Sequence, residues 1–390
     1  MALFGLGKQE AAKTPVAPAP APKPTLAAGS RGAFAPLEDI LRLTVESGAS
    51  DLHMSVGSPP TLRINGTLHR LETRAMFSED TDNIARELAT GDQFHKLLTE
   101  GSVDFAITSA GSNRFRVSIY RQKGTTAMAL RLLPKEKLSF AEIGLPAVAD
   151  QLIRLPRGLV LVTGPTGSGK STTLAAMLHA INTQLGAHIV TVEDPIEYVH
   201  EHANGMVNQR EIGTDVPTFA EGLRRALRQD PDVILVGEMR DLETMETAIR
   251  AAETGHLVFS TLHTTGAGRT VDRIVDSFPA DQQEQIRVQL STNLKAVISQ
   301  LLIPRIDRPG RIAVFEVMIN THSVAALIRD NKTFRIATEI QTGAKVGMMT
   351  IEASLVDLYL AGIIAREEVF SKAQDPELAA QLLAGREVRR

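Results

Sequence analysis

The residues that most clearly point to chemistry are the glycines, lysine and serine of one short run. Gly164-Pro-Thr-Gly-Ser-Gly-Lys-Ser171 fits the phosphate-binding pattern G-x-x-x-x-G-K-[ST]. The glycines let the backbone curl so that successive N–H groups point at phosphate oxygens. Lys170 would then reach the β- and γ-phosphates, and the Ser171 hydroxyl would ligate magnesium. The run predicts that the chain binds ATP and Mg²⁺ through Gly164, Pro165, Thr166, Gly167, Ser168, Gly169, Lys170, Ser171 and Thr172.

The flanking sequence supports this interpretation. Residues 159–162 are apolar, as in a buried strand, and residues 172–178 have helix-forming composition. A strand before the loop and a helix after it are the context that the pattern requires, and the helix N-terminus adds a positive dipole end. A glycine-rich turn with a lysine by chance is the alternative, and this context disfavours it.

A second candidate element ends in Glu238. The apolar residues 233–236 predict a strand that presents Glu238 near its carboxyl end, beside the phosphate loop. A carboxylate there can hold magnesium through water or orient the attacking water.

Three carboxylates crowd the segment 191–198, namely Glu193, Asp194 and Glu197. Such crowding is costly unless cations compensate the charge. One of the three is therefore a candidate base that activates water for hydrolysis. A solvated acidic loop is the alternative.

Two histidines, His256 and His263, bracket another predicted strand. Their spacing places them at opposite ends of that strand, which disfavours a shared metal ion. Gly255 and the neighbouring threonines favour a γ-phosphate or interface sensor over a purely structural role.

The bulk composition narrows the class of protein. The chain has 390 residues, a net charge of −3 and no cysteine, which excludes disulfides and thiolate zinc sites. No apolar run is long enough to cross a bilayer, and the first residues lack the features of a secretory signal. The sequence contains no basic run with interleaved aromatic residues, the pattern that would indicate nucleic-acid binding.

The sequence divides into four parts. Residues 1–33 form a proline- and alanine-rich tail, expected to be disordered, with Phe4 and Leu6 as an alternative docking segment. An α+β domain is expected over 34–133, a polar linker over 134–144 and an α/β domain over 145–390.

Residue patterns also predict individual elements. In the first domain we expect helices over 37–45 and 84–98, a hairpin turning at Asn65-Gly66, and strands over 114–120 and 126–133. In the second we expect a doubly wound parallel sheet with strands over 158–163, 188–192, 233–236 and 257–261. The last hundred residues are expected to be mainly helical, with a possible edge strand over 314–319.

Taken together, five stretches resemble the type II/type IV secretion ATPase family, the hexameric motors of pili and secretion systems. These stretches are 157–174, 193–200, 208–211, 228–244 and 252–264. They are similar to that family's phosphate loop, acidic box, a connecting segment, Walker B element and histidine box. Residues 50–53, 59–60 and 63–66 resemble the opening of its PAS-like N-terminal domain. The resemblance implies an α/β RecA-like P-loop ATPase core, a PAS-like α+β N-terminal domain and a helical C-terminal region.

The resemblance also assigns roles. Glu197 takes the position of the proposed catalytic base, and Glu238 takes the Walker B position for magnesium and water, although which of the two is the base stays open. His256 and His263 take the two histidine-box positions. Arg116 and Arg131 match arginines that reach the γ-phosphate of bound ATP, where positive charge strongly favours phosphoryl transfer.

Within the family, the chain most resembles the retraction type, the ATPases of twitching motility. Extension and secretion ATPases usually carry a four-cysteine zinc module, which this chain lacks. Residues 341–343 and 347–350 also resemble the retraction type. Its C-terminal helix reads A-I-R-N-L-I-R-E, and here Leu327-Ile-Arg329 is kept while Ala326 replaces the asparagine. That change leaves an accessory retraction paralogue as an alternative.

The resemblance further implies a homo-hexamer at the cytoplasmic face of the inner membrane, peripheral to the membrane and not inserted in it. The expected partners are the inner-membrane platform protein of the pilus machine and an accessory retraction ATPase, with no nucleic acid. An extension or secretion ATPase that lost its zinc module, and a regulatory subunit that binds nucleotide but turns over poorly, are the remaining alternatives.

Overall fold

The computed structural model describes residues 35–387, in two compact units that divide between Leu132 and Leu133. The expected tail over 1–33, with Phe4 and Leu6, lies outside the described residues. Within residues 35–387, no helix combines the length and the apolar character needed to cross a membrane.

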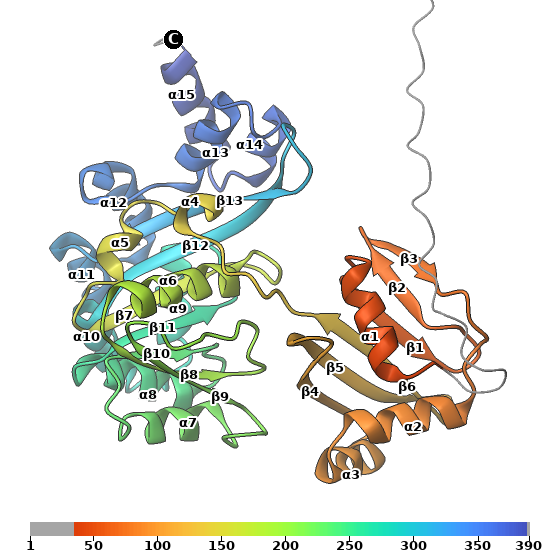
Figure 1. Cartoon of the computed structure of the whole chain (residues 1–390). Helices are drawn as coiled ribbons and strands as arrows, with labels where there is room; N and C mark the ends of the chain where they lie inside the picture. The colour runs from red at the N-terminus through yellow and green to blue at the C-terminus, as the bar shows by residue number, and fades with distance from the viewer. Residues whose placement is uncertain (1–34, 388–390) are drawn as a thin grey trace, which may run out of the picture. The chain divides into compact units, whose positions relative to one another are not determined.

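The first unit, red to orange in Figure 1, is an antiparallel sheet with three helices. Its strand order is β3-β2-β1-β6-β5-β4. The helices bury Ile40, Ile84 and Leu97 in one core with strand residues such as Leu52 and Phe115, which confirms the α+β expectation. The elements are α1 (Leu37–Glu46), β1 (Asp51–Ser55), β2 (Thr61–Ile64), β3 (Thr67–Arg70), α2 (Ser78–Leu88), α3 (Gly91–Glu100), β4 (Ser102–Ser109), β5 (Asn113–Gln122) and β6 (Thr125–Leu132).

Local turn chemistry decides two details of this unit. The hairpin between β2 and β3 is confirmed, with Asn65 and Gly66 at φ angles of 49° and 82°. The prediction of a single helix over 84–98 is wrong, because α2 ends at Leu88 and α3 begins only at Gly91. Thr90 caps α3 by accepting a hydrogen bond from the Gln93 amide, while the Gln93 side chain accepts one from the Thr90 amide. This capping box starts a new helix where apolar periodicity alone suggests continuity.

The second unit is built on a seven-stranded sheet of order β13-β12-β7-β11-β10-β8-β9. Strands β12 to β9 in this order pair in parallel, and β13 pairs antiparallel with β12 at one edge. The four central strands expected from the sequence are confirmed. The strands are β7 (Gly158–Thr163), β8 (His188–Glu193), β9 (Met206–Glu211), β10 (Val233–Val236), β11 (Leu257–Leu262), β12 (Leu294–Pro304) and β13 (Arg311–Ile319).

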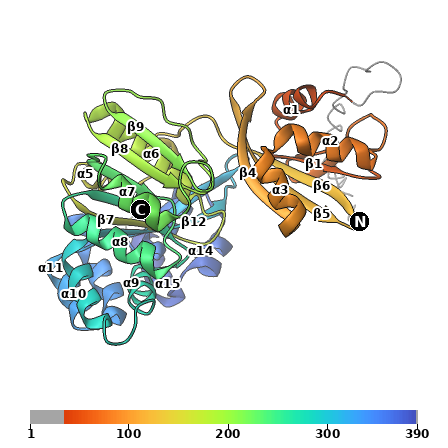
Figure 2. The same ribbon diagram turned by 90° about the horizontal axis from the view of Figure 1, so that it is seen from below.

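Helices cover both faces of this sheet. Leu159 and Leu161 of β7 pack with α8, α9 and α10, whereas Val160 and Val162 pack with α5 and α6. Figures 1 and 2 show α6 and α8 on opposite sides of the sheet. Alternate burial on two covered faces explains why the strands are apolar throughout. The helices are α4 (Phe140–Ile143), α5 (Ala149–Leu152), α6 (Lys170–Gln184), α7 (Phe219–Ala226), α8 (Leu242–Glu253), α9 (Ala267–Val275) and α10 (Gln283–Asn293).

Up to Glu387, the C-terminal hundred residues are mainly helical, as expected, but the region begins with two strands. They contribute β12 and β13 to the main sheet, of which only the edge strand β13 was expected. Beyond the sheet, Ile351 and Leu355 of α13 pack with Ile303 and Val314 from these two strands. The elements that follow are α11 (His322–Arg329), η1 (Thr333–Arg335), α12 (Ile336–Thr342), η2 (Gly343–Val346), α13 (Ile351–Leu360), α14 (Arg366–Lys372) and α15 (Pro376–Glu387).

The segment expected as a linker, 134–144, contains α4 and belongs to the second unit. Ser139 caps this short helix by accepting a hydrogen bond from the Glu142 amide at 3.3 Å. Ile143 is buried against the core that α5 and α6 share. The end of the segment is therefore folded structure.

Candidate nucleotide site

The phosphate loop lies between β7 and α6, as expected. Gly164, Gly167 and Gly169 have φ angles of 143°, 78° and 90°, which only glycine adopts without strain. The ammonium of Lys170 donates to the carbonyls of Gly164 at 2.9 Å and Pro165 at 3.1 Å. Burial lowers the pKa of Lys170, although the nearby carboxylates of Glu238 and Glu197 counter part of that effect.

Glu238 and His263 meet beside this loop. Glu238 follows β10, and its Oε2 atom accepts a hydrogen bond from Arg240 Nε at 2.7 Å. His263 Nε2 lies 3.5 Å from the same oxygen, and His263 Nδ1 lies 3.4 Å from the Thr166 hydroxyl. The sheet therefore brings the expected Walker B carboxylate, one histidine and the phosphate loop close together.

The acidic segment also lies beside the first turn of α6. Glu193 and Glu197 line a small cavity of about 40 Å³ together with Ser171 and Tyr198. The Tyr198 hydroxyl also shares a hydrogen bond with the Thr172 hydroxyl at 2.9 Å. Ser171, Thr172 and Glu197 are thus brought together, and Glu238 is close enough to Lys170 to influence its charge.

Strand β9 holds the acidic segment in place, a role the sequence did not reveal. The Gln209 amide nitrogen donates to Glu193 Oε1 at 3.1 Å and to the Tyr198 carbonyl at 2.8 Å. Its amide oxygen accepts from the His200 N–H at 2.7 Å. Glu211 accepts from the Ile196 N–H at 3.1 Å. Burial raises the pKa of Glu193 to about 7, although the hydrogen bonds from Thr191 and Gln209 counter part of that effect.

His256 does not join the phosphate site of this chain. It lies at the amino end of β11, where its carbonyl accepts from the Gly158 N–H at 3.0 Å. Its ring nitrogen Nδ1 lies 3.0 Å from the Ala251 carbonyl. The phosphate loop begins at the opposite end of β7, so the parallel pairing of β7 and β11 separates His256 from the loop. A role for His256 at an interface stays a prediction.

Arg116 and Arg131 lie in the first unit, on neighbouring strands. The two residues are directly opposite one another in the β5–β6 pair, and both are exposed. Arg131 Nε donates to Asp51 Oδ1 at 2.8 Å. Burial alone would raise the pKa of Asp51, but hydrogen bonds from Arg131 and Ser50 hold that pKa below its usual value. Their contact with a γ-phosphate stays a prediction.

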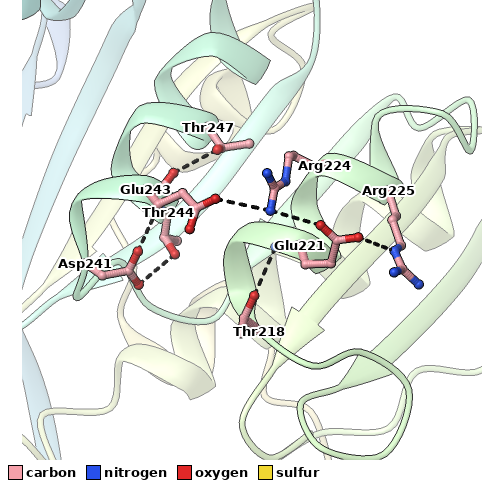
Figure 3. A network of polar contacts seen from close by, with 8 residues as sticks. All are labelled: Thr218, Glu221, Arg224, Arg225, Asp241, Glu243, Thr244 and Thr247. Atoms are coloured by element: carbon pink, nitrogen blue, oxygen red, sulfur yellow. Dashed lines mark hydrogen bonds and ion pairs between the residues drawn. The ribbon is translucent and has the colours of Figure 1, made fainter.

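Helix α8 begins just after Glu238 and is fixed by a polar network (Figure 3). Asp241 caps the helix by accepting from the Thr244 N–H and hydroxyl, both at 2.8 Å. Arg224 on α7 joins Glu221 at 2.9 Å to Glu243 of α8 at 3.1 Å. The Asp241 cap fixes where the segment after Glu238 ends and α8 begins. The exposed ion pairs add little stability.

A twisted parallel sheet, a glycine loop at the start of α6, and carboxylates at the carboxyl ends of β8 and β10 define a P-loop nucleoside triphosphatase. The loop and its lysine are placed where a phosphate could bind, and the Ser171 hydroxyl and the Glu238 carboxylate are the kinds of oxygen group that could hold magnesium.

Comparisons with known proteins identify the family. Residues 33–370 match the model of the family described as type II/IV secretion system protein. The chain is 45% identical to the type IV pilus retraction ATPase PilT of Pseudomonas aeruginosa, covering 87% of this chain and 99% of PilT. It is 39% identical to the type IV pilus ATPase PilU of the same organism, covering 86% and 88% of the two chains.

A solved structure agrees with these relatives. The crystal structure of the pilus retraction motor PilT with bound ADP superposes with a TM-score of 0.83, at 45% identity, over 88% of this chain and 98% of that one. The chain belongs to the type II/IV secretion ATPase family and is an ATPase that binds nucleotide.

Proposed function

We propose that this ATPase powers the retraction of a type IV pilus. The observation that carries the proposal is the 45% identity over 99% of a relative named for that activity. The arrangement around the phosphate loop supports a motor that hydrolyses ATP, since Lys170, Glu197 and Glu238 all surround the first turn of α6.

In this proposal, Lys170 turns from the Gly164 and Pro165 carbonyls to the β- and γ-phosphates of ATP. The Ser171 hydroxyl, and Glu238 directly or through water, would hold Mg²⁺, which would neutralise charge on the phosphates. Glu197 or Glu238 takes the proton from the attacking water. Arg116 and Arg131 from the first unit bring positive charge to the γ-phosphate, and His263 senses the phosphate through its contacts with Thr166 and Glu238.

We further propose that six copies form a ring at the cytoplasmic face of the inner membrane. The ring would act on the inner-membrane platform protein of the pilus machine and would work with an accessory retraction ATPase. These partners, like the absence of a nucleic-acid partner, rest on the family resemblance.

An accessory retraction ATPase is the second candidate. The specific observation in its favour is Ala326 on α11, where the retraction type has asparagine. The 45% identity to PilT, a relative named for retraction, favours the main retraction motor. An extension ATPase without its zinc module is the third.

Deleting the gene tests the proposal, with pili counted by electron microscopy and twitching measured on agar. A retraction motor predicts hyperpiliated cells that do not twitch, which a wild-type copy restores and a Lys170→Ala copy does not. Bald cells would contradict retraction and indicate extension. Normal piliation with weakened twitching would indicate the accessory role.

A further inference from the structure

Beneath the phosphate loop lies Gln300, a glutamine of β12 that is only 2% exposed. Its Oε1 atom accepts a hydrogen bond from the Thr173 hydroxyl at 2.7 Å. Thr173 belongs to the first turn of α6, and its own N–H donates to the Gly169 carbonyl at 3.0 Å. Gln300 is therefore linked through one residue to the last glycine of the loop.

The loop also lies unusually close to Gln300. A Cβ atom added to Gly169 would stand 2.7 Å from Gln300 Nε2, and one added to Gly164 would stand 2.3 Å from the Gln300 carbonyl oxygen. At Gly164 the obstacle is a backbone oxygen, so no side chain fits there. At Gly169 the obstacle is the end of the Gln300 side chain, and the φ angle of 90° disfavours any residue but glycine. The first and last glycines of the loop thus rest on the same residue.

Ser299, the residue before Gln300, makes its contacts on the other face of the sheet. Ser299 Oγ shares a hydrogen bond with the Thr163 hydroxyl at 2.7 Å and accepts from the Gly266 N–H at 3.1 Å. Thr163 is the last residue of β7, and Gly266 closes the loop that contains His263. Because successive side chains of a strand point to opposite faces, β12 supports the nucleotide loops on both.

We propose that Gln300 is a positioning residue for ATP binding and hydrolysis. It holds Gly169 and the first turn of α6 so that the N–H groups of the loop converge on the phosphates. A residue that only filled this space could be apolar, since the surrounding core consists largely of aliphatic side chains. A buried amide is instead kept, bonded to the helix that carries Lys170 and Ser171.

The test uses the purified full-length chain and measures three quantities: the Kd for ADP, kcat and KM for ATP, and the thermal unfolding midpoint. Gln300→Met keeps the approximate size of the side chain and removes its hydrogen bond. Thr173→Val removes the donor, and Thr173→Ser keeps it. Thr183→Val is the matched control, since Thr183 donates to the His179 carbonyl at the far end of α6.

Gln300→Met is expected to raise the Kd for ADP and the KM for ATP about tenfold, and Thr173→Val about threefold. Thr173→Ser and Thr183→Val should bind as the wild type does. The double variant should bind no more weakly than Gln300→Met, because both changes break the same bond.

A positioning role is overturned if Gln300→Met and Thr173→Val lower the unfolding midpoint but leave Kd and KM within about twofold of the wild type. If Gln300→Met does not fold, the comparison of Thr173→Val with Thr173→Ser decides. Equal nucleotide affinity for those two variants would also overturn the proposal.

Discussion

The phosphate loop and the residues around it are built in different ways. The loop is one continuous run, Gly164–Ser171, whose spacing alone specifies a phosphate cradle. Its surroundings come from separate strands: Glu193 ends β8 and Glu197 follows it, Glu238 follows β10, and Gln300 lies on β12. The comparison teaches that the loop supplies the phosphate contacts by local geometry, whereas the order of strands in the sheet supplies the groups that make the contacts productive.

The largest expected effect comes from breaking the loop itself. Lys170→Ala removes the ammonium that would contact the β- and γ-phosphates, and we expect kcat/KM for ATP to fall by about a thousandfold or more. Phosphate release measures it, and circular dichroism checks that the variant is folded. Turnover at the wild-type rate would show that the loop does not hold the reacting phosphates.

The next effect separates the roles of the two carboxylates near Lys170. Glu197→Gln and Glu238→Gln each keep the size of the side chain while removing its charge. The variant that lacks the base should lose about a hundredfold or more in kcat while still binding ATP, and the other should lose less. Stopped-flow binding and phosphate release on both variants give this comparison. Wild-type kcat in both would contradict a base at either position.

A third test asks whether the first unit contributes. Arg131→Ala removes a positive charge that is expected to contact the γ-phosphate and no other part of the nucleotide, so kcat should fall about tenfold while the Kd for ADP stays unchanged. Arg116→Ala should act in the same direction. Arg63→Ala, on β2 of the same unit, is the control and should keep wild-type kcat. An unchanged kcat for Arg131→Ala at saturating ATP rejects the role.

The smallest effect concerns Glu193, which β9 encloses. Its pKa is raised from 4.5 to about 7, so the folded protein binds an extra proton between these pH values. Stability should therefore fall as pH rises through this range, by up to about 1.4 kcal/mol per pH unit from this group, and stay level above it. Glu193→Gln should remove that slope from urea unfolding curves. Exposed Glu201→Gln is the control, and equal slopes for Glu193→Gln and wild type would contradict the burial of this carboxyl.

The difference between local patterns and contacts between distant strands decides which features could be predicted from the sequence. The loop, the four central strands and the hairpin at Asn65-Gly66 are local patterns, and each was predicted from its own residues. The break at Thr90 was missed because apolar periodicity continues across it, and only the pairing of Thr90 with Gln93 marks a cap. That pairing is visible in the sequence.

The supports of the site were harder to predict. The run 294–304 is mostly apolar, rich in branched residues and ends in proline, which could have indicated a buried strand. Nothing in that run indicates that Gln300 lies under Gly169, because the contact depends on β12 pairing with β7. Gln209 likewise gains its role only through the pairing of β9 with β8. Contacts that depend on which strands pair in the sheet cannot be recognised from a short stretch of sequence.

The most direct test of the account is phosphate release by the purified full-length chain over a range of ATP concentrations with Mg²⁺ present. We predict saturable release that Lys170→Ala abolishes. If the wild-type protein bound nucleotide but released no phosphate at any ATP concentration, that result would contradict a hydrolytic motor. It would indicate a regulatory subunit that only binds nucleotide.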